Sequence, residues 1–119
     1  MKGFPEFIRA LPRPDSPVPM EARIVPSEHV LTMFYEIDDP VDIPEHVHGA
    51  QWGVVLEGTM EMTIGGETRR YGPGDSYSVP GGVPHVARIG AGYRGLDVFA
   101  DPHRYDPLPE GAAPTRERL

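Results

Sequence analysis

The sequence of 119 residues contains no cysteine. Disulfide bonds, thiolate metal ligands and a cysteine nucleophile are therefore excluded. Lysine occurs once, as Lys2, and 18 acidic residues outnumber 11 basic ones, which gives a net charge of −7. Because nucleic-acid binding depends on basic surfaces that neutralise phosphates, this composition argues against a nucleic-acid partner.

Long apolar runs are also absent, so nothing in the sequence resembles a membrane span. The first residues lack the apolar core of a signal peptide. From these absences we predict a cytoplasmic protein without membrane contact. The spacing of Phe4, Phe7, Ile8 and Leu11 fits one face of a short amphipathic helix, which we expect to pack on the outside of the domain.

Proline and glycine, in contrast, are abundant, with 15 and 14 residues. Both interrupt helices, so they argue against a helical bundle and favour an all-β domain with many turns. Met60, Met62 and Ile64 alternate with polar neighbours at the period of a strand, and Gly65-Gly66 then has the composition of a two-residue hairpin turn. We expect strands at 22–25, 29–37, 51–57, 59–64, 67–71, 76–79, 84–89 and 93–99.

A chain of this length fits a single domain. We expect its strand-rich core at about residues 22–105, after an N-terminal extension at 1–21 and before a loose tail at 106–119. The extension contains a proline-rich connector at 12–19, which resists regular strand pairing. The tail is rich in proline, glycine and charge, as poorly ordered termini often are.

Two of the five histidines form the segment His46-Val47-His48. On a strand, residues i and i+2 face the same side, so both imidazoles would point to one side at a separation that suits one metal ion. An isolated pair of this kind is weak evidence, because most such pairs are surface or core histidines. The motifs that follow strengthen it.

The segment from Gly74 to His85 resembles the second motif of small single-domain cupins. That motif reads Gly, five residues, Pro, one residue, Gly, two residues, His, three residues, Asn. It is met in register at Gly74, Pro80, Gly82 and His85, and only the final Asn is replaced, by Ile89.

The first cupin motif is met at His46, His48 and Gly58, with two departures. Pro40 stands in place of its glycine, and Gln51 stands in place of its glutamate ligand. The gap between His48 and Gln51 is also one residue short, so the strand cannot run regularly there.

A bulge or tight turn at Gly49-Ala50 is the expected way for Gln51 to turn back toward the histidines. The resemblance then implies four metal ligands: His46, His48, Gln51 and His85. None of them is charged, so the ion keeps nearly its full double positive charge and favours an anionic ligand. Such donors suit a divalent transition metal, here Zn, Ni, Fe or Mn.

The resemblance also implies the fold, an RmlC-like double-stranded β-helix, which is a jelly-roll barrel of two antiparallel sheets. Small cupins usually form homodimers through edge strands. We expect residues 22–26 to supply such an edge, and a homodimer to result.

On the last expected strand, Asp97 and Phe99 share one face. The cupins of pectin breakdown, which open unsaturated uronates at a three-His, one-Gln site, have an Asp-x-Phe here and an Arg soon after. Asp97, Phe99 and Arg104 resemble that arrangement, although Arg104 is displaced by one residue. The resemblance implies a catalytic role for these three residues, with Asp97 as the proton-transfer group; otherwise Asp97 is a solvated strand residue. Trp52 and Tyr77 are expected in the core or at the pocket mouth.

Three functions stay open at this point. The first is a metal-dependent enzyme that acts on a small anionic carbonyl or sugar-acid-type compound by isomerase, cyclase, lyase or ring-opening chemistry. The cyclases of aromatic polyketides, another cupin group with a three-His, one-Gln site, point the same way. The second is a metal-dependent dioxygenase, and the third is a non-catalytic module that binds a small molecule or a metal. Because one fold hosts many activities, the choice depends on the site.

Overall fold

Short strands separated by glycine and proline turns account for most of the chain. The computed structural model describes residues 1–113, with one helix, α1 (Glu6–Arg9). The strands are β1 (Glu21–Pro26), β2 (Leu31–Ile37), β3 (Val41–His46), β4 (Gln51–Glu57), β5 (Met60–Ile64), β6 (Glu67–Tyr71), β7 (Ser76–Val79), β8 (His85–Ile89) and β9 (Tyr93–Phe99).

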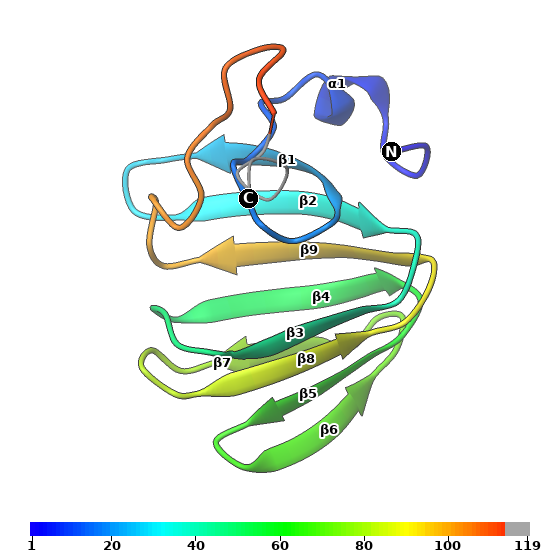
Figure 1. Ribbon diagram of the computed structural model, residues 1–119, viewed down its shortest axis with the longest axis vertical. Coiled ribbons are helices and arrows are strands. Elements are labelled where there is room, and N and C mark those ends of the chain that lie inside the picture. The colour runs from blue at the N-terminus through cyan, green and yellow to red at the C-terminus, as the bar shows by residue number, and fades with distance from the viewer. Residues whose placement is uncertain (114–119) are drawn as a thin grey trace.

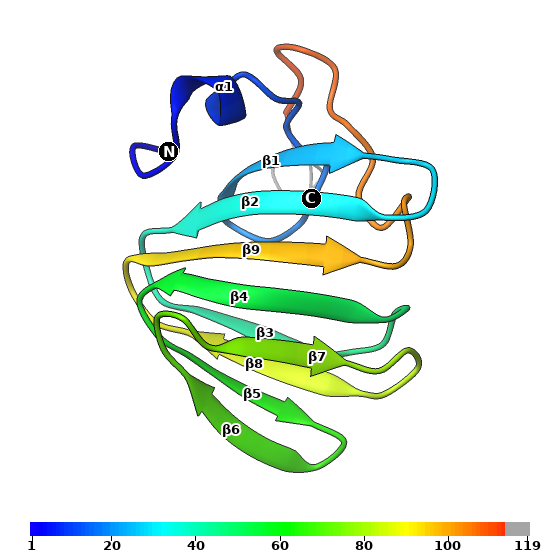
Figure 2. The ribbon, with the colours of Figure 1, turned by 180° about the vertical axis from the view of Figure 1, so that it is seen from behind.

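The strands form two antiparallel sheets. One has the order β1-β2-β9-β4-β7 and the other has the order β3-β8-β5-β6. Consecutive strands often lie in different sheets, so the chain crosses repeatedly between them, as in a jelly roll. Figures 1 and 2 show α1 beside β1 at one end of the molecule and β6 at the opposite end. The predicted double-stranded β-helix is confirmed.

Alternation along the strands builds the core between the sheets. In β2 and β9 every second residue is buried. The strand register places Met33 beside Asp97, and Asp97 beside Gly53, in one inward row of the five-stranded sheet. In the four-stranded sheet, Met62 pairs with Ala87, and both side chains point inward. These inward rows later form the walls of the site.

The turn at Gly65-Gly66 fixes the register of the β5–β6 hairpin. The two residues have φ angles of +56° and +83°. A two-residue turn of this kind needs positive φ at both positions, which glycine adopts without strain. Ile64 and Glu67 therefore pair across the turn, as the sequence predicted.

Strand β3 was missing from the sequence prediction. Three of its six residues are exposed and none is buried, so buried and exposed positions do not alternate along it. Pro44 interrupts it, because proline has no N–H to donate. The pairing with β8 accordingly shifts between Ile43 and His46. This irregularity lies directly before the histidine pair.

The N-terminal segment packs on the outside of the barrel, but its helix is only one turn long. Phe4 is buried and contacts the Phe34 ring edge-on, with 5.7 Å between ring centroids. Phe7, which the helical spacing placed on the same apolar face, is 75% exposed. No helix within residues 1–113 is long and apolar enough to cross a membrane.

The connector and the beginning of the tail bind each other. The Asp15 N–H donates to the Asp106 carbonyl, and the Leu108 N–H donates to the Arg13 carbonyl, both at 2.8 Å. The prediction of a loose tail falls partly on residues 114–119, which lie outside the described residues.

Strand β1 forms one edge of the five-stranded sheet. The Ile24 N–H on this edge donates to the Pro12 carbonyl at 2.8 Å, and Arg23 Nε–H donates to the Arg9 carbonyl at 2.8 Å. The N-terminal segment thus covers part of the edge that we expected to pair with a second copy. The homodimer stays a prediction.

Candidate metal centre

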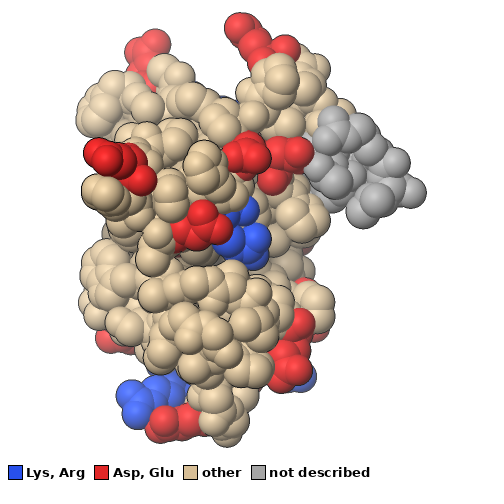
Figure 3. Space-filling model, turned by 90° about the vertical axis from the view of Figure 1, so that its left-hand side faces the viewer, with Lys and Arg blue, Asp and Glu red and all other residues tan. Residues whose placement is uncertain are grey.

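The candidate site lies at one end of the barrel, where β3 and β9 end and where β4 and β8 begin. Figure 3 looks onto this end of the molecule. Basic atoms gather near the middle of the face, with acidic groups beside them, and much of the remaining surface is uncharged. The charge at the entrance is therefore mixed.

Three imidazoles meet at this end. His46 is the last residue of β3 and pairs with His85, the first residue of β8, so the two are neighbours in one sheet rather than facing each other across the barrel. His48 lies beyond the end of β3. The ligand nitrogens of the three residues all lie within 4.8 Å of one another. The convergence predicted from the motif spacing is therefore present.

Each imidazole is oriented through its Nδ1 atom, which lies at hydrogen-bond distance from a backbone carbonyl. The distances are 2.9 Å from His46 to Pro44, 2.7 Å from His48 to Gly49 and 2.9 Å from His85 to Val83. When Nδ1–H donates in a neutral ring, Nε2 keeps its lone pair and is available as a ligand.

The Nε2 atoms of His48 and His85 are only 3.0 Å apart. In these tautomers both atoms are acceptors, so neither can donate to the other. A shared cation is the arrangement that accommodates two lone pairs at this distance. The donor set thus fits a divalent transition-metal ion, for which imidazole is a suitable ligand.

The protonation state also suits a metal. Burial is the main cause that lowers the pKa of His48 and His85, while their backbone hydrogen bonds oppose it and the Arg104 guanidinium lowers both further. A lowered pKa keeps an imidazole neutral at neutral pH, and the neutral form is the one that binds metal.

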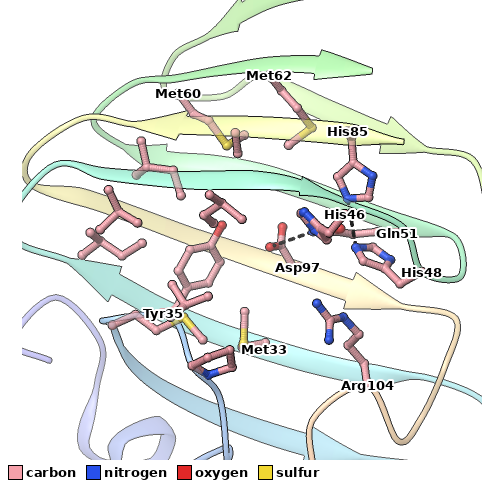
Figure 4. A pocket seen from close by; sticks show the side chains of 18 of the residues that line it. Met33, Tyr35, His46, His48, Gln51, Met60, Met62, His85, Asp97 and Arg104 are labelled. Carbon is pink, nitrogen blue, oxygen red and sulfur yellow. Dashed lines mark hydrogen bonds between the residues drawn. The ribbon is translucent and has the colours of Figure 1, made fainter. Parts of the chain in front are cut away.

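Gln51 reaches the same space from the other sheet. Residues 47–50 carry the chain from β3 in the four-stranded sheet to β4 in the five-stranded sheet. The bulge or tight turn that we expected at Gly49-Ala50 is therefore a crossing between the two sheets. Figure 4 shows the Gln51 side chain between Asp97 and the imidazoles. Its Nε2–H donates to Asp97 Oδ2 at 3.1 Å, so the amide oxygen is the atom available as a ligand.

Asp97 lies inside the barrel and is only 3% exposed, so it is not a solvated strand residue. The Tyr77 hydroxyl donates to its Oδ1 atom, and the Tyr35 hydroxyl lies 3.4 Å from that of Tyr77. Burial raises the pKa of Asp97 to about 6, against the hydrogen bonds from Tyr77, Tyr35 and Gln51, which lower it. A buried carboxyl with a raised pKa beside a cavity is a frequent feature of acid–base sites.

Gly53 leaves room for the Asp97 carboxyl because it has no side chain. It pairs with Asp97, and a Cβ added at Gly53 would collide with the Asp97 carboxylate and the Tyr77 hydroxyl. We expect Gly53→Ala to lower the free energy of unfolding by about 1–3 kcal/mol, because both side chains must shift within a packed sheet. Denaturant unfolding measures this change.

The matched control is Gly49→Ala, where an added Cβ meets no atom within 4 Å. Its unfolding free energy should stay within about 0.5 kcal/mol of the wild-type value. Equal stabilities of the two variants would contradict the close packing of Gly53 against Asp97.

The site opens into a cavity of about 370 Å³ between the sheets. This volume lies near the lower end for ligand pockets.

Arg104, from the loop after β9, also lines the cavity. Its guanidinium lies 4.4 Å from the Tyr105 ring centroid and 5.9 Å from that of Phe99. Arg104 Nε is buried and has no hydrogen-bond partner among the described residues. A buried donor of this kind needs an acceptor, which a water molecule or a bound ligand can supply.

Two aromatic residues differ from the sequence interpretation. Trp52 is 44% exposed and pairs with Val98 on the outer face of the five-stranded sheet, so the prediction of a core or pocket position is wrong. Tyr77 is buried and lines the cavity, which agrees with the prediction of a core or pocket position. Tyr35 was missed, although it follows Met33 at the period of an inward strand face.

Comparison with known proteins agrees with this geometry. Residues 34–90 match the cupin domain family, over a segment that contains all three imidazoles of the cluster. Residues 34–90 are therefore cupin-like in sequence as well as in fold. Comparison with curated proteins gives no match.

Solved structures share the cupin barrel. KdgF from Halomonas sp. is 23% identical, with a TM-score of 0.62, over 76% of this chain and 81% of that one. SPY1581 from Streptococcus pyogenes, a conserved protein of unknown function, is 26% identical, with a TM-score of 0.62 over 73% and 75% of the two chains. An RmlC-like cupin from Shewanella frigidimarina is 20% identical, with a TM-score of 0.66 over 83% and 86%. These likenesses show the jelly-roll fold.

Proposed function

We propose that this cupin is a metal-dependent enzyme that acts on a small anionic carbonyl compound by isomerase, cyclase, lyase or ring-opening chemistry. The observation that carries the proposal is the convergence of three imidazoles beside a buried carboxyl at the entrance of a cavity. A divalent transition metal, Zn, Ni, Fe or Mn, polarises a carbonyl oxygen when it is bound. Its ligands are His46, His48, Gln51 and His85.

The remaining site residues supply proton transfer and anion binding. Asp97 accepts a proton from the carbon next to the carbonyl group, and its two oxygens are held by Tyr77 and Gln51. A base with a pKa near 6 is ionised at neutral pH and still strong enough to act efficiently. Arg104 binds the anionic group through its unpartnered N–H, and Phe99 forms the wall beneath the guanidinium.

Elemental analysis of protein purified without added metal tests the site, with wild type and Gln51→Ala in parallel. We expect metal in the wild type and less in the variant. Oxygen uptake by the metal-loaded protein would contradict the proposal in favour of a dioxygenase. A protein that holds small molecules without any metal would instead be a binding module.

The neutrality of Gln51 gives a separate prediction. Gln51→Glu should keep metal content equal or higher, because a carboxylate is also a ligand, but it adds a negative charge beside the ion. We expect azide to bind about tenfold or more weakly, since one charge at about 4 Å contributes ~1–4 kcal/mol between water and a protein surface. The absorption spectrum of cobalt-loaded protein measures azide binding.

Ser78→Glu is the control, because it adds the same charge on the exposed outer face of β7. Its azide affinity should equal that of the wild type. An azide affinity unaffected by Gln51→Glu would mean that Gln51 does not lie beside the ion.

A further inference from the structure

The cavity changes character beyond the metal ligands. The inward rows of both sheets continue past the imidazoles toward the far end of the barrel. Apart from Asp42, an exposed residue of β3 that also lines the cavity, the wall that the four-stranded sheet supplies there is apolar. It consists of Val41, Ile43, Met60, Met62, Ala87 and Ile89. We call this part the apolar chamber; Figure 4 shows Met60 and Met62 pointing into it.

The opposite wall of the chamber carries polar groups that already satisfy one another. Asp97 accepts hydrogen bonds from Tyr77 and Gln51, and the Tyr77 hydroxyl lies 3.4 Å from that of Tyr35. Met33, beside Asp97 in the same row, is apolar. A ligand with several hydroxyl groups would meet only Asp97, Tyr77 and Tyr35 as polar partners here and would lose more hydrogen bonds to water than it gains, which opposes binding.

We propose that the substrate combines a carboxylate or keto-acid head with an apolar body, either alkyl or aromatic, rather than the hydroxyl groups of a sugar acid. The head lies at the imidazoles and at Arg104, and the body fills the apolar chamber. Methionines suit this wall, because their unbranched side chains adapt to different apolar shapes. The position of the head rests on the proposed function, whereas the character of the chamber does not.

Calorimetry on the zinc-loaded protein with unbranched carboxylates, from acetate to octanoate, tests the inference. Each added methylene should lower Kd about fourfold until the chamber is filled. Glucuronate should bind no more tightly than acetate. A flat series, or glucuronate binding more tightly than hexanoate, would overturn the inference.

A substitution in the chamber wall provides a second measurement. Ala87 is buried and lines the chamber, so Ala87→Leu fills space within it, and octanoate should bind at least tenfold more weakly while acetate binds as before. Val86→Leu is the matched control, since Val86 is the neighbouring residue of β8 and faces outward. Equal octanoate affinities in the two variants would count against the chamber, and the wild-type series decides the question even if Ala87→Leu does not fold.

The metal-free protein separates this inference from the proposed function. Without metal, the Kd of every carboxylate should be higher. The factor by which each added methylene lowers Kd should persist, because the chamber wall contains no metal ligand. If the protein bound no metal and Kd still fell with each added methylene, the proposed function would fail and this inference would stand. If it bound metal and the series were flat, the inference would fail and the proposed function would stand.

Discussion

His85→Ala is expected to abolish stoichiometric metal binding. The His85 side chain is 2% exposed, its Nδ1 contacts a backbone carbonyl, and its Nε2 lies 3.0 Å from that of His48. The next inward residue on the same strand is Ala87, which has no donor atom to replace it. Since loss of a partner that merely orients a ligand costs about 10–100-fold in metal affinity, loss of the ligand itself should cost at least about 100-fold.

Competition with a chelator measures this affinity, and thermal unfolding gives an independent readout. A metal at 100 times its Kd stabilises a fold by about 2.7 kcal/mol, so zinc should raise the Tm of the wild type and leave that of His85→Ala unchanged. His103→Ala is the control, because His103 is exposed and lies outside the cluster. Equal metal contents in wild type and His85→Ala would show that the imidazoles do not share an ion.

The parts of the site that the sequence predicted are those fixed by local geometry. His46, His48 and His85 each lie at or just beyond a strand end, where glycine and proline determine the path of the chain over a few residues. Motif spacing therefore carried enough information to bring the three imidazoles together. The strand period put Asp97 on one face with Phe99, for the same reason, but it left open whether that face points into the barrel or to solvent.

The parts that were missed depend on contacts between segments distant in the sequence. The hydrogen bonds that Asp97 accepts from Tyr77 and Gln51 join three strands, and no local pattern specifies which inward residues meet. Trp52 was misplaced because a large aromatic residue suggests burial, whereas the strand period puts it on the outer face. β3 was missed because Pro44 and its exposed residues remove the alternation by which strands are recognised.

Asp97→Asn should lower the rate of carbon-bound proton exchange by about 10²–10⁴-fold, the usual contribution of a general base. The substitution removes the proton acceptor and preserves the shape of the side chain. An asparagine amide oxygen can still accept from Gln51, and its NH₂ group can donate to the Tyr77 hydroxyl, which accepts as well as donates. Metal content should therefore stay at the wild-type level.

The exchange of hydrogen for deuterium at carbon 3 of 2-oxohexanoate, followed by NMR in D₂O on zinc-loaded protein, measures this step without knowledge of the natural substrate. The carboxylate takes the proton from carbon 3, the electron pair moves toward the carbonyl oxygen, and a deuteron returns to the same carbon. Asp101→Asn, in the exposed loop after β9, is the control and should catalyse exchange at the wild-type rate.

Exchange catalysed by Asp97→Asn at the wild-type rate would show that Asp97 is not the base. A wild type that binds the acid and metal but catalyses no exchange would be a binding module. In that case the raised pKa of Asp97 would reflect only its burial beside the apolar chamber.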